Sequence, residues 1–146
     1  MTRQTMILTL LVSALAAGCA SKGKETPTYA FGCPMGHKPG TSMQDVIRAK
    51  VKLAGKVPDV KVTDIRCRMQ GDLLHVDFTL ANRSGDVRRV SYRFEWMDEA
   101  GYRAWDAESW KPVMLYEHAD ETILATAPTR KATDFNIVLL DQDEDR

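Results

Sequence analysis

The feature that most constrains the fold is an alternation of apolar and polar side chains that starts near Val60. Three runs show it clearly, at residues 65–69, 74–80 and 90–96, and turn-forming residues separate them. Because successive side chains of a strand point to opposite faces, each run predicts a strand with one buried face.

Four more strands are expected further along the chain. They are predicted at Tyr102–Trp105, around Val113–Tyr116, at Glu121–Thr126 and at Phe135–Leu139. Short strands at intervals of about ten residues favour a sandwich, and no room is left for the helical crossovers of a parallel sheet. The predicted fold is therefore mainly β, an antiparallel immunoglobulin-like β-sandwich of about seven short strands.

One short helix is expected before the strands. Ser42 opens a capping-box-like Ser-Met-Gln-Asp sequence, in which Asp45 takes the role usually held by Glu. Apolar side chains then recur at helical spacing, at Met43, Ile47, Val51 and Ala54. Gly55 and Pro58 are the expected stop.

The first 18 residues resemble the export signal of a bacterial lipoprotein. Arg3 supplies a positive charge, and the apolar run at 6–12 is too short to span a bilayer, which needs about 20 residues. Ala16-Ala17-Gly18 before Cys19 look like a lipobox, although Leu15 sits one place early. We therefore expect Cys19 to be lipidated and to become the first mature residue. A buried N-terminal helix with a structural Cys19 is the disfavoured alternative, because the run has no polar face.

Three segments follow from these patterns. Residues 1–18 are the predicted signal peptide, 19–41 a lipid-anchored tether and loop rich in Gly, Pro and Lys, and 42–146 a single β-sandwich domain. Two acyl chains would hold the protein at a membrane. Ala20 stands where an Asp would signal retention at the inner membrane. The expected location is therefore the periplasmic face of the outer membrane, with the inner membrane as the alternative.

Two further cysteines could form a disulfide or contribute to a metal site. Cys33 and Cys67 would lie in an oxidising compartment, and an even pair predicts a disulfide. Cys33, Met35 and His37 also form a ligand set that suits Cu(I), which makes copper handling an alternative function. A disulfide at Cys33 would remove the thiolate that this alternative needs.

Composition and motifs argue against two broad classes of function. Lys and Arg number 20 and Asp and Glu also number 20, so net charge gives no attraction for nucleic acid. No serine elbow, phosphate loop or His-Glu-x-x-His motif occurs. We expect no catalytic residues and no cofactor, and hence not an enzyme.

One segment carries a family resemblance. Val90-Ser-Tyr-Arg-Phe-Glu-Trp-Met-Asp-Glu-Ala-Gly101, preceded by Leu80-Ala-Asn-Arg-Ser84, resembles the central motif of the YcfL-like family of small periplasmic lipoproteins, a domain of unknown function. The match covers Val60 to Leu140. The resemblance implies a compact sandwich on a lipid anchor, with no catalytic residues to carry over.

The expected function is binding or structural support in the cell envelope. The partner would be another envelope protein or cell-wall material, recognised through a sheet face or an open edge strand. Tyr102, Trp105 and Trp110 are the candidate surface residues, because they exceed what one small core needs.

Overall fold

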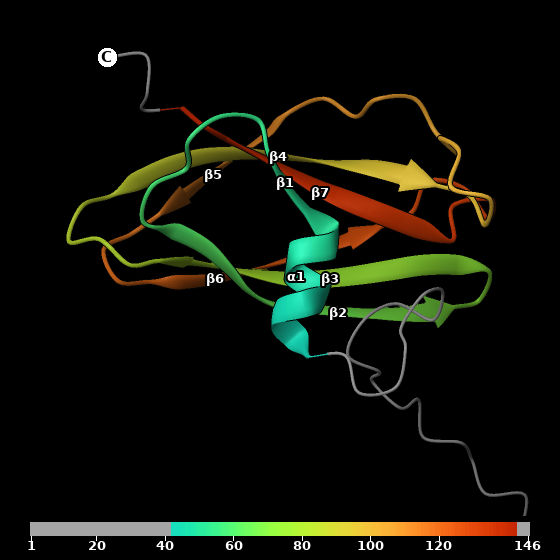
Figure 1. The fold of residues 1–146 in the computed structure, drawn as a ribbon, viewed down its shortest axis with the longest axis horizontal. Coiled ribbons are helices and arrows are strands. Elements are labelled where there is room, and N and C mark those ends of the chain that lie inside the picture. The colour runs from blue at the N-terminus through green and yellow to red at the C-terminus, as the bar shows by residue number, and fades with distance from the viewer. Residues whose placement is uncertain (1–41, 143–146) are drawn as a thin grey trace, which may run out of the picture.

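The structure, a computed structural model, describes residues 42–142. In this part of the chain one helix and seven strands form two facing layers (Figure 1). The elements are α1 (Met43–Lys50), β1 (Val51–Leu53), β2 (Val60–Gln70), β3 (Leu73–Asn82), β4 (Arg88–Met97), β5 (Lys111–Leu115), β6 (Asp120–Thr126) and β7 (Asp134–Asp141). The predicted fold class, a mainly β sandwich with one short N-terminal helix, is confirmed.

The strands divide into a sheet of four and a sheet of three. The four-stranded sheet has the order β1-β7-β4-β5 and the three-stranded sheet the order β2-β3-β6. β4 lies antiparallel to β7, with Phe94 opposite Ile137 and Glu95 opposite Asn136. The pair of β1 and β7 is parallel, so the expectation of a purely antiparallel arrangement is wrong at this edge.

Helix α1 begins as predicted but ends early. The hydroxyl of Ser42 accepts a hydrogen bond from the backbone N–H of Asp45, whose carboxylate accepts one from the N–H of Ser42. The helix ends at Lys50, and Val51 onward joins β7 as β1, so the prediction that the helix reaches Ala54 is wrong. Pairing with β7 satisfies the backbone there and overrides the helical spacing of the side chains. No helix within residues 42–142 has the length and hydropathy needed to cross a membrane.

The predicted strand at Tyr102–Trp105 does not form. A single bridge joins Arg103 to Met97, and the chain instead makes a turn around Asp98. The Asp98 carboxylate accepts hydrogen bonds from the backbone N–H groups of Ala100 and Tyr102, at 3.0 and 2.8 Å. Backbone pairing is confined to this bridge, with Asp98 N–H donating to the Tyr102 carbonyl at 2.8 Å and Ala104 N–H to the Trp96 carbonyl at 2.9 Å. Capture of the Tyr102 N–H by the Asp98 side chain removes one donor that a longer ladder would use.

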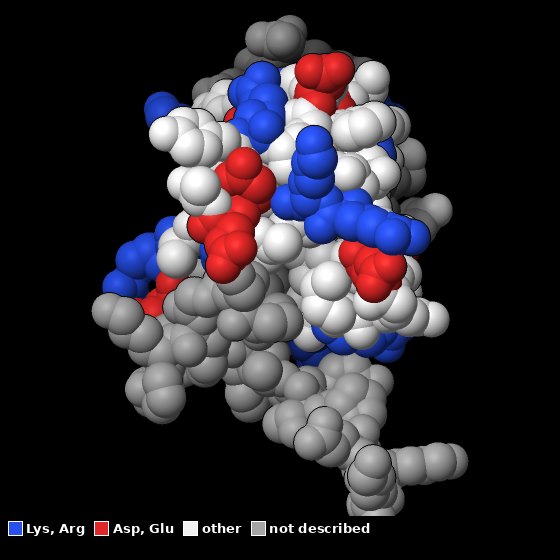
Figure 2. Space-filling view, turned by 90° about the vertical axis from the view of Figure 1, so that its right-hand side faces the viewer, with Lys and Arg blue, Asp and Glu red and all other residues white. Residues whose placement is uncertain are grey.

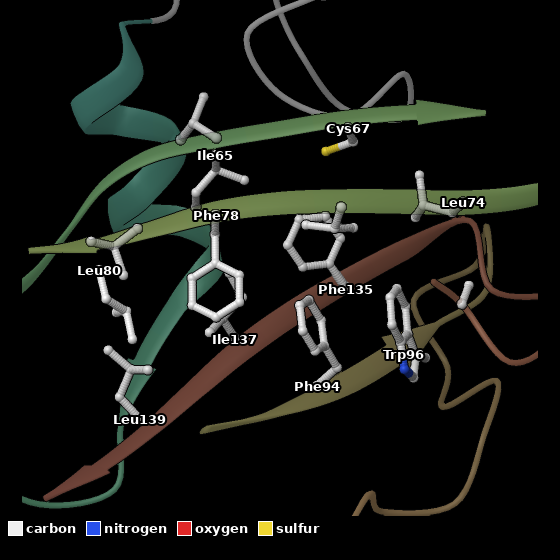
Figure 3. Close-up of a cluster of buried hydrophobic side chains, with 14 of the residues drawn as sticks. Ile65, Cys67, Leu74, Phe78, Leu80, Phe94, Trp96, Phe135, Ile137 and Leu139 are labelled. Carbon is white, nitrogen blue, oxygen red and sulfur yellow. The ribbon is translucent and has the colours of Figure 1, made fainter. Parts of the chain in front are cut away.

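Aromatic side chains fill the space between the two sheets (Figure 3). Phe94 stacks on Trp96 at 4.7 Å between ring centroids and meets Phe78 of the opposite sheet edge-on at 5.8 Å. Phe135 of β7 packs against Phe94 at 5.7 Å. All four side chains are 0–1% exposed. The inward face of β4 is therefore structural, and only its outward face is available for recognition.

Candidate binding surface at the β4–β5 loop

The β4–β5 loop, residues 98–110, carries all three aromatic residues predicted to form a binding surface. It leaves the end of β4 and runs outside the four-stranded sheet (Figure 1). Tyr102 is 73% exposed and Trp105 is 48% exposed. Trp110 is only half-buried, and its ring lies over the guanidinium of Arg93 at 4.6 Å. The structure thus places Tyr102 and Trp105 on an open surface, whereas Trp110 packs on the sheet.

One carboxylate fastens this loop to the core. The indole Nε1 of Trp96 donates a hydrogen bond to Glu108 Oε1 at 2.6 Å, and Lys111 Nζ donates to Glu108 Oε2 at 2.8 Å. The side chain of Glu108 is 14% exposed. Figure 3 shows the indole nitrogen of Trp96 turned away from the other core side chains. The buried Trp96 N–H therefore has its partner, and the loop is held at its far end.

Arg103 lines two shallow hollows. The Lys52 hollow has a volume of about 160 Å³ and lies on the outer face of the sheet. Its lining residues are Lys52, Glu95, Trp96, Met97, Gly101, Arg103 and Asn136. The Trp105 hollow has a volume of about 240 Å³ and is lined by residues 103–106 of the loop. Arg103 is exposed and lines both hollows.

Two of the three charged side chains of the Lys52 hollow pair with each other, and the third does not. Lys52 Nζ donates a hydrogen bond to Glu95 Oε2 at 2.9 Å, and this bond, opposed by partial burial, lowers the pKa of Glu95. Asn136 and the charge of Arg93 add to the lowering. The guanidinium of Arg103 has no hydrogen-bond or ion-pair partner among the described residues. Of the two cations that line the Lys52 hollow, Arg103 is therefore the one whose side chain has no ion-pair partner among the described residues.

Sequence reasoning missed Lys52, Glu95, Arg103 and Asn136. They come from β1, β4, the β4–β5 loop and β7, and only the sheet register brings them together. The available signal was the outward position of Glu95 beside the inward aromatic residues of β4. That position predicts that Glu95 faces water, but it does not identify the residues that lie beside Glu95 on neighbouring strands.

The thiol and metal predictions fall mostly outside the described residues. Cys19, Cys33, Met35 and His37 all lie there. Cys67 lies in β2, is 5% exposed and is disulfide-bonded, while its pairing with Cys33 stays a prediction. Within residues 42–142 no group of three or more His, Cys, Asp or Glu side chains could hold a metal ion.

Other surface features offer less to a partner. A hollow on the outer face of the three-stranded sheet is lined by Asp64, Arg66, Asp77, Thr79 and Thr122. Its groups largely satisfy one another, since Arg66 pairs with Asp64 at 2.6 Å and Thr79 bonds Thr122 at 3.0 Å. Figure 2 views the end of the sandwich where β4 finishes, and basic and acidic side chains are interspersed on it. A field of one sign does not dominate this face.

Comparison with known proteins identifies the domain without naming an activity. The structure is similar to the crystal structure of Campylobacter jejuni cj0090, with 21% identity over 64% of this chain and 98% of that one, at a TM-score of 0.56. It is also similar to a DUF1425 family member from Shewanella sp. pv-4, with 23% identity over 55% and 75% of the two chains, at a TM-score of 0.51. These likenesses show a shared fold. No curated protein matches the chain. The model of a protein family of unknown function matches residues 44–141, and the chain therefore belongs to that family, DUF1425.

Proposed function

We propose that this chain is a lipid-anchored, non-catalytic binding module of the bacterial cell envelope, of the YcfL-like kind. The observation that carries the binding role is the β4–β5 loop, which presents Tyr102 and Trp105 to solvent beside the unpaired Arg103. Aromatic and arginine side chains dominate recognition surfaces because each combines a large contact area with a polar or charged group.

The way the loop is held supports recognition. Glu108 ties it to the core through Trp96, and the Asp98 carboxylate organises the turn. A surface whose loop is fixed before binding loses less conformational freedom on forming a complex. The ionised Glu95, neutralised by Lys52, suits a fixed polar contact more than proton transfer at neutral pH.

The proposed anchoring rests on the N-terminal sequence. A short apolar run followed by Ala16-Ala17-Gly18-Cys19 supports export and lipidation, and Ala20 favours the periplasmic face of the outer membrane over the inner membrane. The partner would then be another envelope protein or cell-wall material.

Complementation of a deletion strain tests the binding surface. A Tyr102→Ala, Trp105→Ala double variant should fail to restore the envelope phenotype at normal protein levels. The matched control is Met114→Ala, Tyr116→Ala, which removes two large exposed side chains, 48% and 67% exposed, at the opposite end of β5. Full complementation by the first variant would refute the proposal.

A further inference from the structure

We propose that the surface around Arg103 binds a carboxylate of a cell-wall polymer, with the Arg103 guanidinium as its charged partner and Trp105 as the flat surface on which the adjoining part of the polymer lies. This inference deepens the proposed binding function and rests on it. Its physical basis is the unpaired guanidinium of Arg103, together with the shape and the limited apolar area of the two hollows.

The unpaired guanidinium favours an anionic group at Arg103. The residues lining the Lys52 hollow include two cations, Lys52 and Arg103, and one carboxylate, Glu95. Lys52 Nζ pairs with Glu95 Oε2 at 2.9 Å, so within this hollow Arg103 is the cation that has no ion-pair partner among the described residues. A guanidinium binds a carboxylate through two parallel hydrogen bonds, which makes it the best-matched side chain for this anion.

Acidic residues also stand near Arg103. Asp98 is occupied, because its carboxylate accepts two backbone N–H groups of the turn. Asp106 lines the Trp105 hollow, yet it forms no ion pair with Arg103 in the described part of the chain. Arg103 therefore keeps its donors free for a ligand.

Shape favours an extended ligand. The two hollows have volumes of about 160 and 240 Å³, whereas a pocket that encloses a compact small molecule measures about 300–1,000 Å³. A polymer chain that crosses Arg103 would place one of its chemical groups in each hollow. Trp105 is 48% exposed, so the uncharged part of the polymer can pack on its ring.

The limited apolar area favours a polymer over a folded protein. A stable protein interface buries about 800 Å² per partner around an apolar centre. Tyr102 and Trp105 are the large exposed apolar side chains of the β4–β5 loop, and Met114 and Tyr116 lie toward the opposite end of β5. A polymer with repeating carboxylates compensates for a small contact by offering many equivalent sites to proteins held on one membrane.

Co-sedimentation with purified cell-wall sacculi tests this inference. The full-length protein in detergent is mixed with protein-free sacculi, either untreated or with their carboxylates converted to neutral amides. We expect binding to untreated sacculi, loss of binding after amidation, and about tenfold weaker binding for Arg103→Gln, the loss of one charge-assisted contact. Lys131→Gln is the matched control, since Lys131 is an exposed cation outside both hollows, and it should bind as the parent protein does.

The possible results distinguish a failure of the carboxylate assignment from a failure of the proposed binding function. Binding that survives amidation, or that Arg103→Gln leaves unchanged in a protein with unaltered thermal unfolding, would overturn the carboxylate assignment. Absence of sacculus binding together with failed complementation by Tyr102→Ala, Trp105→Ala would also overturn it while the binding surface stood. If that double variant also complemented fully, the proposed function would fall with it.

Discussion

Trp96 and Glu108 join the interior of this sandwich to its surface. The indole N–H of Trp96, a side chain that is 1% exposed, reaches Glu108 Oε1 at 2.6 Å across the base of the β4–β5 loop. The aromatic side chain that packs between the sheets therefore also fixes the segment that carries Tyr102, Arg103 and Trp105. Fold stability and the shape of the candidate surface are coupled at this bond.

Removing the acceptor should weaken the fold. Glu108→Ala leaves the Trp96 N–H without its partner and is expected to lower the free energy of unfolding by about 1–3 kcal/mol. Urea unfolding followed by tryptophan fluorescence measures the loss. Glu108→Gln is the matched control, because its side-chain oxygen still accepts the hydrogen bond, and it should retain most of the stability. Equal stability of all three proteins would show that water replaces Glu108 at no cost.

Asn82 should be the most sensitive polar position of the fold. Its side chain is 0% exposed, and Nδ2 donates to the carbonyl oxygens of Asp86, Leu115 and Tyr116 at 2.7, 3.2 and 2.9 Å. Oδ1 accepts from the backbone N–H of Ser84 at 2.9 Å. Asn82→Ala leaves these groups without their partner and is expected to cost about 2–4 kcal/mol in the free energy of unfolding.

Thermal and urea unfolding of the Asn82 variant check this expectation. Ser84→Ala serves as a control, because it removes only the hydroxyl that donates to Asn82 Oδ1 at 2.8 Å and leaves the three hydrogen bonds of Asn82 Nδ2 in place. A loss at Asn82 no larger than that at Ser84 would contradict the role assigned to the buried amide.

Glu95 should make the stability of the fold depend on pH in the acid range. Its pKa lies below the ordinary value of 4.5, chiefly because Lys52 donates a hydrogen bond to the carboxylate. A carboxyl whose pKa is lower in the folded state than in the unfolded state stabilises the fold above the unfolded value, and the contribution is lost as pH falls through the folded value. Unfolding free energies at pH 7 and at steps below pH 4.5 should therefore fall less steeply for Glu95→Gln than for the parent protein. Parallel curves would exclude the predicted contribution of Glu95.

The thiols decide between the predicted disulfide and the copper alternative. If Cys67 pairs with Cys33, the intact mass should be about 2 Da below that of the reduced chain, the mass of two hydrogens. The oxidised protein should then retain no copper after titration and native mass measurement. Copper bound by free thiols, and lost in a Met35→Ala, His37→Ala double variant, would reverse this conclusion.

Cys19 should carry the membrane attachment. In cells that express the full chain, Cys19→Ser should abolish incorporation of labelled palmitate and move the protein from the membrane fraction to the soluble fraction. Cys33→Ser is the matched control and should remain in the membrane fraction. Palmitate incorporation that survives Cys19→Ser would refute the lipobox assignment.

Most strands could be predicted from local pattern, because alternation records which face of a strand is buried. β1 could not, because Val51 continues the helical spacing of Met43 and Ile47, and only its distant partner Ile137 makes it a strand. The strand predicted at Tyr102 has the opposite cause, since local alternation is present there but pairing stops after one bridge, where the Asp98 carboxylate takes the Tyr102 N–H.

The candidate site was predictable only in part. Exposure of Tyr102 and Trp105 follows from surplus aromatic residues in a turn-rich segment, and the structure places both side chains at the surface. The grouping of Lys52, Glu95 and Asn136 depends on the register of β1, β4 and β7, which no local pattern encodes. Side chains that meet across a sheet are far apart in the sequence, and the alternation within one strand does not show which residues lie opposite it.

β4 has a consequence for how this family can diverge. Its inward side chains, Phe94 and Trp96, fill the core, while its outward side chains, Arg93 and Glu95, contact Trp110 and Lys52. Core packing and surface contacts therefore constrain alternate positions of one strand. Relatives that recognise different ligands should change at every second residue of β4 and keep bulky apolar groups between, and an insertion of one residue would exchange the two roles and be eliminated.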